Sequence, residues 1–251
     1  MGAVRGYTSK LKQHAQTTTI EQQERLFLSL SEQLSQTFLR LTRIAELAPN
    51  TDEQTKSHQW ELVHDVAEAA MFLTESYALN VRLLQHLASP EIEPVMISSL
   101  FYDAAQQLAP IAERYGVELQ LADAPRMSPV MSDRLVLQSA LVSLGQVFVA
   151  AQAENENIQP LHFAAHRSRY GVVAGIYAEH CELSADVFRR SRSLYGIARQ
   201  PLARLASGSS SGVYIADNLL SAIAAKLHVA RYHNLTGLAT TLPVCNQLQL
   251  V

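Results

Sequence analysis

The sequence has little of what several classes of protein need. Only two of its 251 residues are cysteines, so it has no disulfide framework, and free thiols fit a reducing cytoplasm. No apolar run approaches about 18 residues, so we expect no membrane-spanning helix, and residues 1–13 lack the apolar core of a signal peptide. Lysine and arginine number 20 against 23 acidic residues, which argues against nucleic acid as a partner.

The chain does contain enough apolar material for a core. Apolar residues make up 48% and charged residues 17%, which are the proportions of a folded protein rather than a disordered one. A chain of 251 residues forms one large domain or two smaller ones. These features predict a soluble cytoplasmic protein.

Apolar residues recur every seven positions along two stretches of the first 90 residues. The repeated positions are Ile20, Phe27, Leu34 and Leu41 in the first stretch, and Trp60, Ala67, Thr74 and Val81 with Val63, Ala70, Tyr77 and Leu84 in the second. This heptad pattern predicts two long helices joined by a turn at 49–52. One hairpin cannot bury both seams, so we expect residues 1–90 to form a homodimer, a dimeric four-helix bundle. The alternative is that a second domain covers the hairpin within one chain.

Residues 91–251 alternate between helical and extended patterns. The predicted helices are 99–115, 132–152 and 213–227, and the predicted strands are 117–121, 161–168, 172–178, 227–233 and 237–244. Residues 91–96 form a joint or a short first strand. This order predicts a two-layer α/β sandwich, in which helices cover one face of a mixed sheet. The predicted fold class is therefore α+β, with a hairpin domain at 1–90 and the sandwich at 91–251.

Two segments carry a more specific pattern. Residues 31–38 read SEQLSQTF, and residues 133–152 read DRLVLQSALVSLGQVFVAAQ. With the order of the elements, they resemble the core of sensor histidine kinases, which is a dimerising helical hairpin followed by an ATP-binding sandwich of the histidine-kinase and gyrase type. The first segment is similar to the phosphoacceptor box S-H-E-L-R-T-P-L, and the second is similar to the N box.

The resemblance implies which site residues have been replaced. Glu32 stands where the family has its phosphorylated histidine. Ser143 and Val147 stand where the N box has two asparagines, of which the second holds magnesium on the nucleotide phosphates. Valine cannot ligate magnesium, which takes oxygen ligands.

Two further boxes of the family are only partly present. Glu179 follows the strand at 172–178, where the family has D-x-G-x-G with an aspartate that binds adenine. Gly208 and Gly212 are what remains of the last glycine box, and a glycine-rich loop before a helix can hold a phosphate. The resemblance thus implies a degenerate nucleotide-binding site formed by Ser143, Val147, Glu179, Gly208 and Gly212.

These substitutions predict a protein that has kept the kinase scaffold and lost catalysis. We expect no catalytic residue, no metal and no required cofactor, although the family binds ATP with magnesium. The partners that the resemblance implies are the receiver domain of a response regulator or a sensor kinase. The predicted docking residues are Glu32, Gln33, Gln36 and Arg40 on the first helix and Arg189, Arg190 and Arg192 in a basic cluster.

Two other functions remain open. His64 is followed by Asp65, the local signature of a phosphoacceptor in related phosphotransfer proteins, so the chain could relay phosphate through His64. Alternatively, residues 208–212 and the basic cluster could bind ATP or ADP in a nucleotide sensor with residual binding.

Overall fold

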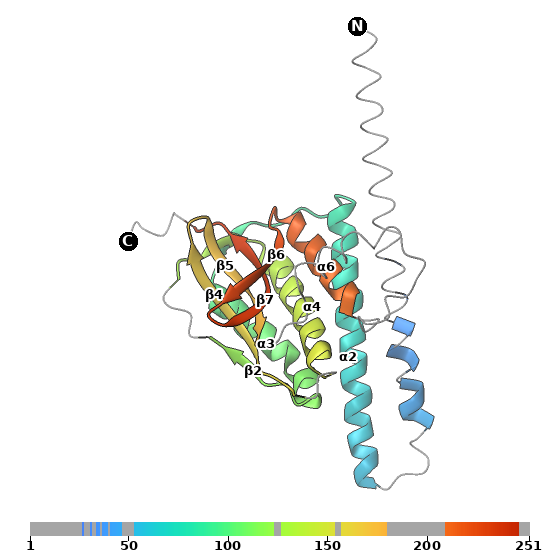
Figure 1. Ribbon diagram of the computed structural model, residues 1–251. Helices are drawn as coiled ribbons and strands as arrows, with labels where there is room; N and C mark the ends of the chain where they lie inside the picture. Colours follow the sequence, from blue (N-terminus) through green and yellow to red (C-terminus); the bar gives the residue numbers. More distant parts are fainter. Residues whose placement is uncertain are drawn as a thin grey trace, which may run out of the picture.

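The computed structural model shows a long helix packed against an α/β sandwich (Figure 1). It describes residues 53–122, 127–153, 157–179 and 209–245, and before them residues 27, 31, 34–35, 37–39 and 41–46. The helices are α2 (Glu53–Leu84), α3 (Ile97–Arg114), α4 (Arg134–Ala153) and α6 (Ser209–Ala222). The strands are β1 (Glu93–Val95), β2 (Leu119–Leu121), β3 (Val130–Ser132), β4 (Leu161–Ser168), β5 (Gly171–Ala178), β6 (Leu227–Tyr232) and β7 (Leu235–Leu242).

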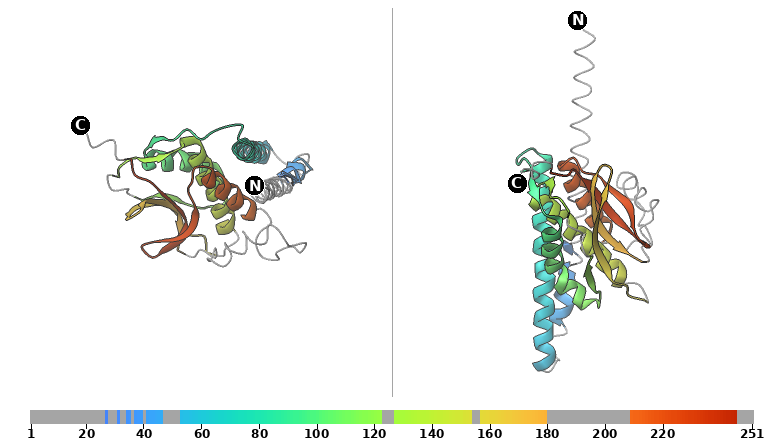
Figure 2. Two further views of the ribbon diagram at one scale, coloured as in Figure 1. Left: turned by 90° about the horizontal axis from the view of Figure 1, so that it is seen from above. Right: turned by 90° about the vertical axis from the view of Figure 1, so that its left-hand side faces the viewer.

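Five strands form one mixed sheet in the order β2-β4-β5-β7-β6. β2 runs parallel to β4, and the other neighbours are antiparallel. A row of directly paired apolar residues, Phe163, Ile176, Leu238 and Val229, crosses four of these strands and packs into the main core. The helices α3, α4 and α6 cover this face of the sheet (Figure 2). The predicted sandwich with a mixed sheet is therefore confirmed.

α4 lies at the centre of the helical layer, between α3 and α6. It is apolar on all sides, and most of its residues are buried, as expected for a core helix. In the described part of the chain it is the one helix long and apolar enough to cross a membrane, but 72% of that stretch is buried inside the protein. Its neighbour α3 comes very close at Gly145, where a Cβ atom would lie 2.1 Å from Cδ1 of Leu108.

α2 packs on the side of the helical layer that faces away from the sheet (Figure 2). The side chains that it buries are Val66, Leu73, Ser76, Asn80 and Leu83. Their spacing of three, four and seven residues makes a single stripe along the helix. The amide Nδ2 of Asn80 donates a hydrogen bond to the carbonyl oxygen of Ile215 in α6 at 3.0 Å, so this buried polar group is satisfied and ties α2 to α6.

The predicted dimeric four-helix bundle is not evident in this structure. The described residues between 27 and 46 are helical and run beside α2 (Figure 1), and Leu34 packs against the main apolar core, which includes Leu73 and Leu83 of α2. The stripe that α2 buries differs from the predicted heptad seam that contains Trp60. The side chain of Trp60 is 70% exposed. The sequence pattern indicated the helix correctly, and Tyr77 and Leu84 of the second predicted seam pack partly buried against the core. The fully buried stripe, which includes Val66, Leu73 and Asn80, was not predicted, although these residues also repeat every seven positions.

The sandwich elements lie close to their predicted positions, with two differences. The strands predicted at 161–168 and 172–178 are β4 and β5, and residues 91–96 contain β1. The helix predicted at 213–227 begins earlier, at Ser209, so that residues 209–212 are helical rather than part of a loop. It also ends earlier, at Ala222, because Ala224 takes a positive φ of 56° and Leu227 begins β6. β3 has no counterpart in the prediction, since it has only three residues and pairs with the distant β1.

The second face of the sheet carries a smaller apolar cluster of Ala164, Val173, Tyr177 and Ala239. The ring of Tyr177 lies 5.6 Å from the ring of Tyr232, centroid to centroid. Tyr177 is fully buried, and its hydroxyl has no hydrogen-bond partner in the described part of the chain. Burial, with a smaller contribution from Tyr232, raises the pKa of Tyr177 to about 12.

Replacing Tyr177 with phenylalanine should change how stability depends on pH. A tyrosine in the unfolded chain has a pKa of about 10. Above that pH the unfolded wild type loses a proton that the folded protein keeps until about pH 12, so ionisation favours unfolding. We expect the wild type to lose free energy of unfolding relative to Y177F as the pH rises above about 10.

Urea denaturation of both proteins at a series of pH values measures this difference. Below the pKa of tyrosine in the unfolded chain, the difference in free energy of unfolding between the two proteins should not change with pH. In that range Y177F should be at least as stable as the wild type, because a buried hydroxyl without a hydrogen-bond partner is unfavourable. A difference that stays constant on both sides of about pH 10 would contradict the raised pKa.

Candidate functional site

The sandwich brings together three of the residues singled out from the sequence. Ser143 and Val147 lie one turn apart on α4, and Gly212 lies near the start of α6. A Cβ atom on Gly212 would lie 2.5 Å from Cγ2 of Val147 and 3.0 Å from the carbonyl oxygen of Ser143. α6 therefore approaches α4 too closely for a side chain at this point, and glycine permits the contact.

The side chains at this contact are closely packed and almost fully buried. Val147 is 3% exposed and Ser143 is 4% exposed. The alkyl group of Val147 has no lone pair to offer a hard cation. Among the described residues, no group of three or more His, Cys, Asp or Glu side chains could hold a metal ion.

Asp133 fixes the start of α4. Its Oδ1 accepts a hydrogen bond from the backbone N–H of Val136 at 2.9 Å, the arrangement of a helix N-cap. Its Oδ2 accepts a second one from the backbone N–H of Glu91 at 2.8 Å, in the segment that follows α2. One carboxylate thus connects the start of α4 to the segment that follows α2.

Of the remaining predicted site residues, the structure describes Glu179 and His64. Glu179 directly follows β5 and is exposed. Gly208 lies outside the described residues, as do all the predicted docking residues, Glu32, Gln33, Gln36, Arg40, Arg189, Arg190 and Arg192.

His64 is an exposed residue of α2. Its Nε2 lies 3.3 Å from Oε1 of Glu68, one helical turn later, and the two side chains are 72% and 58% exposed. The imidazole is thus open to solvent and has a carboxylate beside it.

Asn80 is a buried polar position of the long helix that the sequence pattern did not single out. Its hydrogen bond to the carbonyl oxygen of Ile215 ties α2 to α6. The signal was present in the spacing, because Asn80 lies seven residues after Leu73 and four after Ser76, all on one face of a helix.

No protein-family model matches this sequence, and no curated protein matches it. The chain is similar to solved structures of histidine kinases. The histidine kinase AdeS of Acinetobacter baumannii matches with a TM-score of 0.55 at 10% sequence identity, over 85% of this chain and 98% of that chain. Full-length ShkA in complex with AMPPNP matches with a TM-score of 0.51 at 16% identity, over 86% of this chain and 46% of that chain. The chain therefore has a histidine-kinase-like fold, as the sequence pattern predicted.

Replacing Gly212 with alanine should destabilise the protein, although alanine is the better helix former by about 1 kcal/mol. The added Cβ would fall 2.5 Å from Val147, in a well-packed core. We expect a net loss of about 1–3 kcal/mol in the free energy of unfolding, measured by urea denaturation.

The Val147→Ala variant provides the matched control. It removes the methyl groups that the new Cβ meets, so the double variant V147A/G212A should be less destabilised than the sum of the two single variants. A G212A protein as stable as the wild type, or strictly additive effects, would mean that the two helices do not approach so closely.

Proposed function

We propose that this chain is a non-catalytic, histidine kinase-like interaction protein of a cytoplasmic two-component signalling pathway. The observation that carries the proposal is Val147, an aliphatic side chain packed against Gly212 where kinases of the resembling family have a magnesium-binding asparagine. Phosphoryl transfer depends on charge neutralisation and positioning, which valine cannot supply. Glu32 at the phosphoacceptor position supports the same conclusion, because a carboxylate side chain cannot act as a histidine phosphodonor.

The same contact favours an interaction protein over a nucleotide sensor. Gly212 was expected to belong to a loop that holds phosphate, but it is buried against α4. The proposed function therefore needs no nucleotide, metal or other cofactor.

We propose further that the chain works as a homodimer through residues 1–90. Large apolar side chains of this segment lie outside the core of the single chain, each between 58% and 70% exposed: Phe27, Phe38, Leu39, Trp60 and Met71. Met71 lies about 20° around α2 from Trp60, so these two share one face of the helix. Covering that face with a second copy removes apolar surface from water.

Replacing Trp60 with glutamate should weaken the dimer without unfolding the chain, because a charge would be buried in an apolar interface. By sedimentation equilibrium, the mass of the wild type in solution should be twice the 27.7 kDa mass of one chain. The mass of W60E should be closer to that of the monomer. Tyr102→Glu is the matched control, since Tyr102 is an aromatic residue 57% exposed on α3, outside residues 1–90. A wild type that sediments as a monomer would remove the dimer from the proposal.

The proposed partner is a receiver domain or a sensor kinase, docked on Glu32, Gln33, Gln36 and Arg40 and on the cluster Arg189, Arg190 and Arg192. The guanidinium groups would bind the carboxylates of an acidic receiver site.

Titration against purified receiver domains tests this proposal. We expect saturable binding to at least one receiver, weakened about tenfold in the Arg40→Glu variant, as expected where an attractive charge contact becomes a repulsive one. Arg231→Glu, an equal charge change at an exposed residue of β6, should leave the affinity unchanged. If no receiver or sensor kinase binds, the two-component function fails.

Phosphotransfer through His64 is the second candidate, and the exposed imidazole beside Glu68 favours it. Incubation with a receiver phosphorylated on its aspartate separates the two functions. An acid-labile label that appears on the wild type and is absent from His64→Ala would replace the non-catalytic function with phosphotransfer. Binding without any label supports the non-catalytic one.

A further inference from the structure

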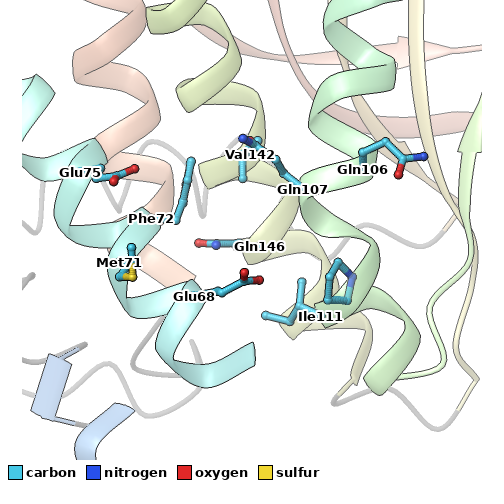
Figure 3. Close-up of a pocket in the computed structure, with 10 residues that line it drawn as sticks. Glu68, Met71, Phe72, Glu75, Gln106, Gln107, Ile111, Val142 and Gln146 are labelled. Atoms are coloured by element: carbon cyan, nitrogen blue, oxygen red, sulfur yellow. The ribbon is translucent and has the colours of Figure 1, made fainter. Parts of the chain in front are cut away.

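A cavity of about 300 Å³ lies between α2, α3 and α4, and Gly212 is not among its lining residues (Figure 3). Its apolar surface includes Phe72 of α2, Ile111 of α3 and the buried Val142 of α4. This volume is at the small end of the range of ligand pockets, where a few polar groups typically orient a mostly apolar molecule.

The polar groups of the cavity favour a cation. Glu68 and Glu75 contribute carboxylates from α2, and none of the ten lining residues carries a positive charge. In Figure 3 the carboxylate of Glu68 and the amide of Gln146 extend from opposite helices into the same space. An anion there would meet two negative charges, whereas a cation would find a carboxylate and an amide oxygen as acceptors.

We propose that this cavity binds a small organic cation with an apolar body. The ammonium or amidinium group binds Glu68 and Gln146, and the apolar part lies against Phe72 and Ile111. The present partner of Glu68, His64, is on the solvent side and largely exposed, so little is lost when Glu68 turns to a ligand. Because α2 forms one wall and α3 and α4 the other, a bound cation also adds a contact between the long helix and the sandwich.

Titration of the full chain with 2-phenylethylamine tests the proposal, with phenylacetate as the anionic analogue and phenylacetamide as the neutral one. We expect saturable binding of the amine with a Kd of about 1 mM, the affinity of a ligand with so few atoms. The melting temperature should rise with amine concentration, because the ligand binds only the folded state. Phenylacetate should not bind.

The Glu68→Gln variant keeps the shape of the side chain and removes its charge. We expect it to bind the amine about three- to tenfold more weakly, as for the loss of a charge-assisted hydrogen bond at a partly exposed site. Glu113→Gln is the matched control, because Glu113 is an exposed residue of α3 that does not line the cavity. Equal binding of amine and amide, equal effects of E68Q and E113Q, or no saturable binding would overturn the proposal.

Discussion

The packing around α4 positions the other parts of the sandwich. One neighbouring helix, α3, approaches it where Gly145 leaves room for Leu108, and another, α6, approaches it where Gly212 meets Val147. The sheet covers a further side, through the apolar row that includes Phe163 and Ile176. Because protein interiors are packed at nearly crystalline density, neither helix can shift without opening a void or creating a clash. The two glycines therefore determine how the whole helical layer fits together.

This packing is consistent with the proposal that the chain keeps a histidine-kinase-like fold without the chemistry of a kinase. The fold requires apolar surface on α4 and close approach at the two glycines, and a valine meets that requirement at position 147 better than a polar side chain would. Holding magnesium requires an oxygen ligand at the same position. Because the two requirements are independent, the fold alone does not imply an activity. Function has to be inferred from the residues that stand at the site.

The elements of the sandwich were predictable because their signals are local. β4 and β5 are apolar runs separated by a short turn, and Gly116, with a φ of 66°, follows α3 as a glycine at a helix end should. The residue at which α6 ends could not be predicted from the helical spacing of apolar residues, because apolar residues continue as far as Leu227. Gly212 and Val147 are distant in the sequence and meet only in the folded chain. Their contact, in which Val147 leaves no room for a side chain at position 212, could therefore not be predicted from the sequence.

The covered face of α2 shows why contact with the sandwich and the proposed dimer interface can coexist. Leu73, which faces the sandwich, lies about 140° around the helix from Trp60. A second copy covering Trp60 therefore need not displace the sandwich, and one rigid helix would contact both. Rotation of α2 by a single residue position, about 100°, would move Asn80 away from Ile215 and leave a buried amide without its acceptor. That hydrogen bond therefore opposes any signal that turns α2, and a ligand between α2, α3 and α4 would oppose it further.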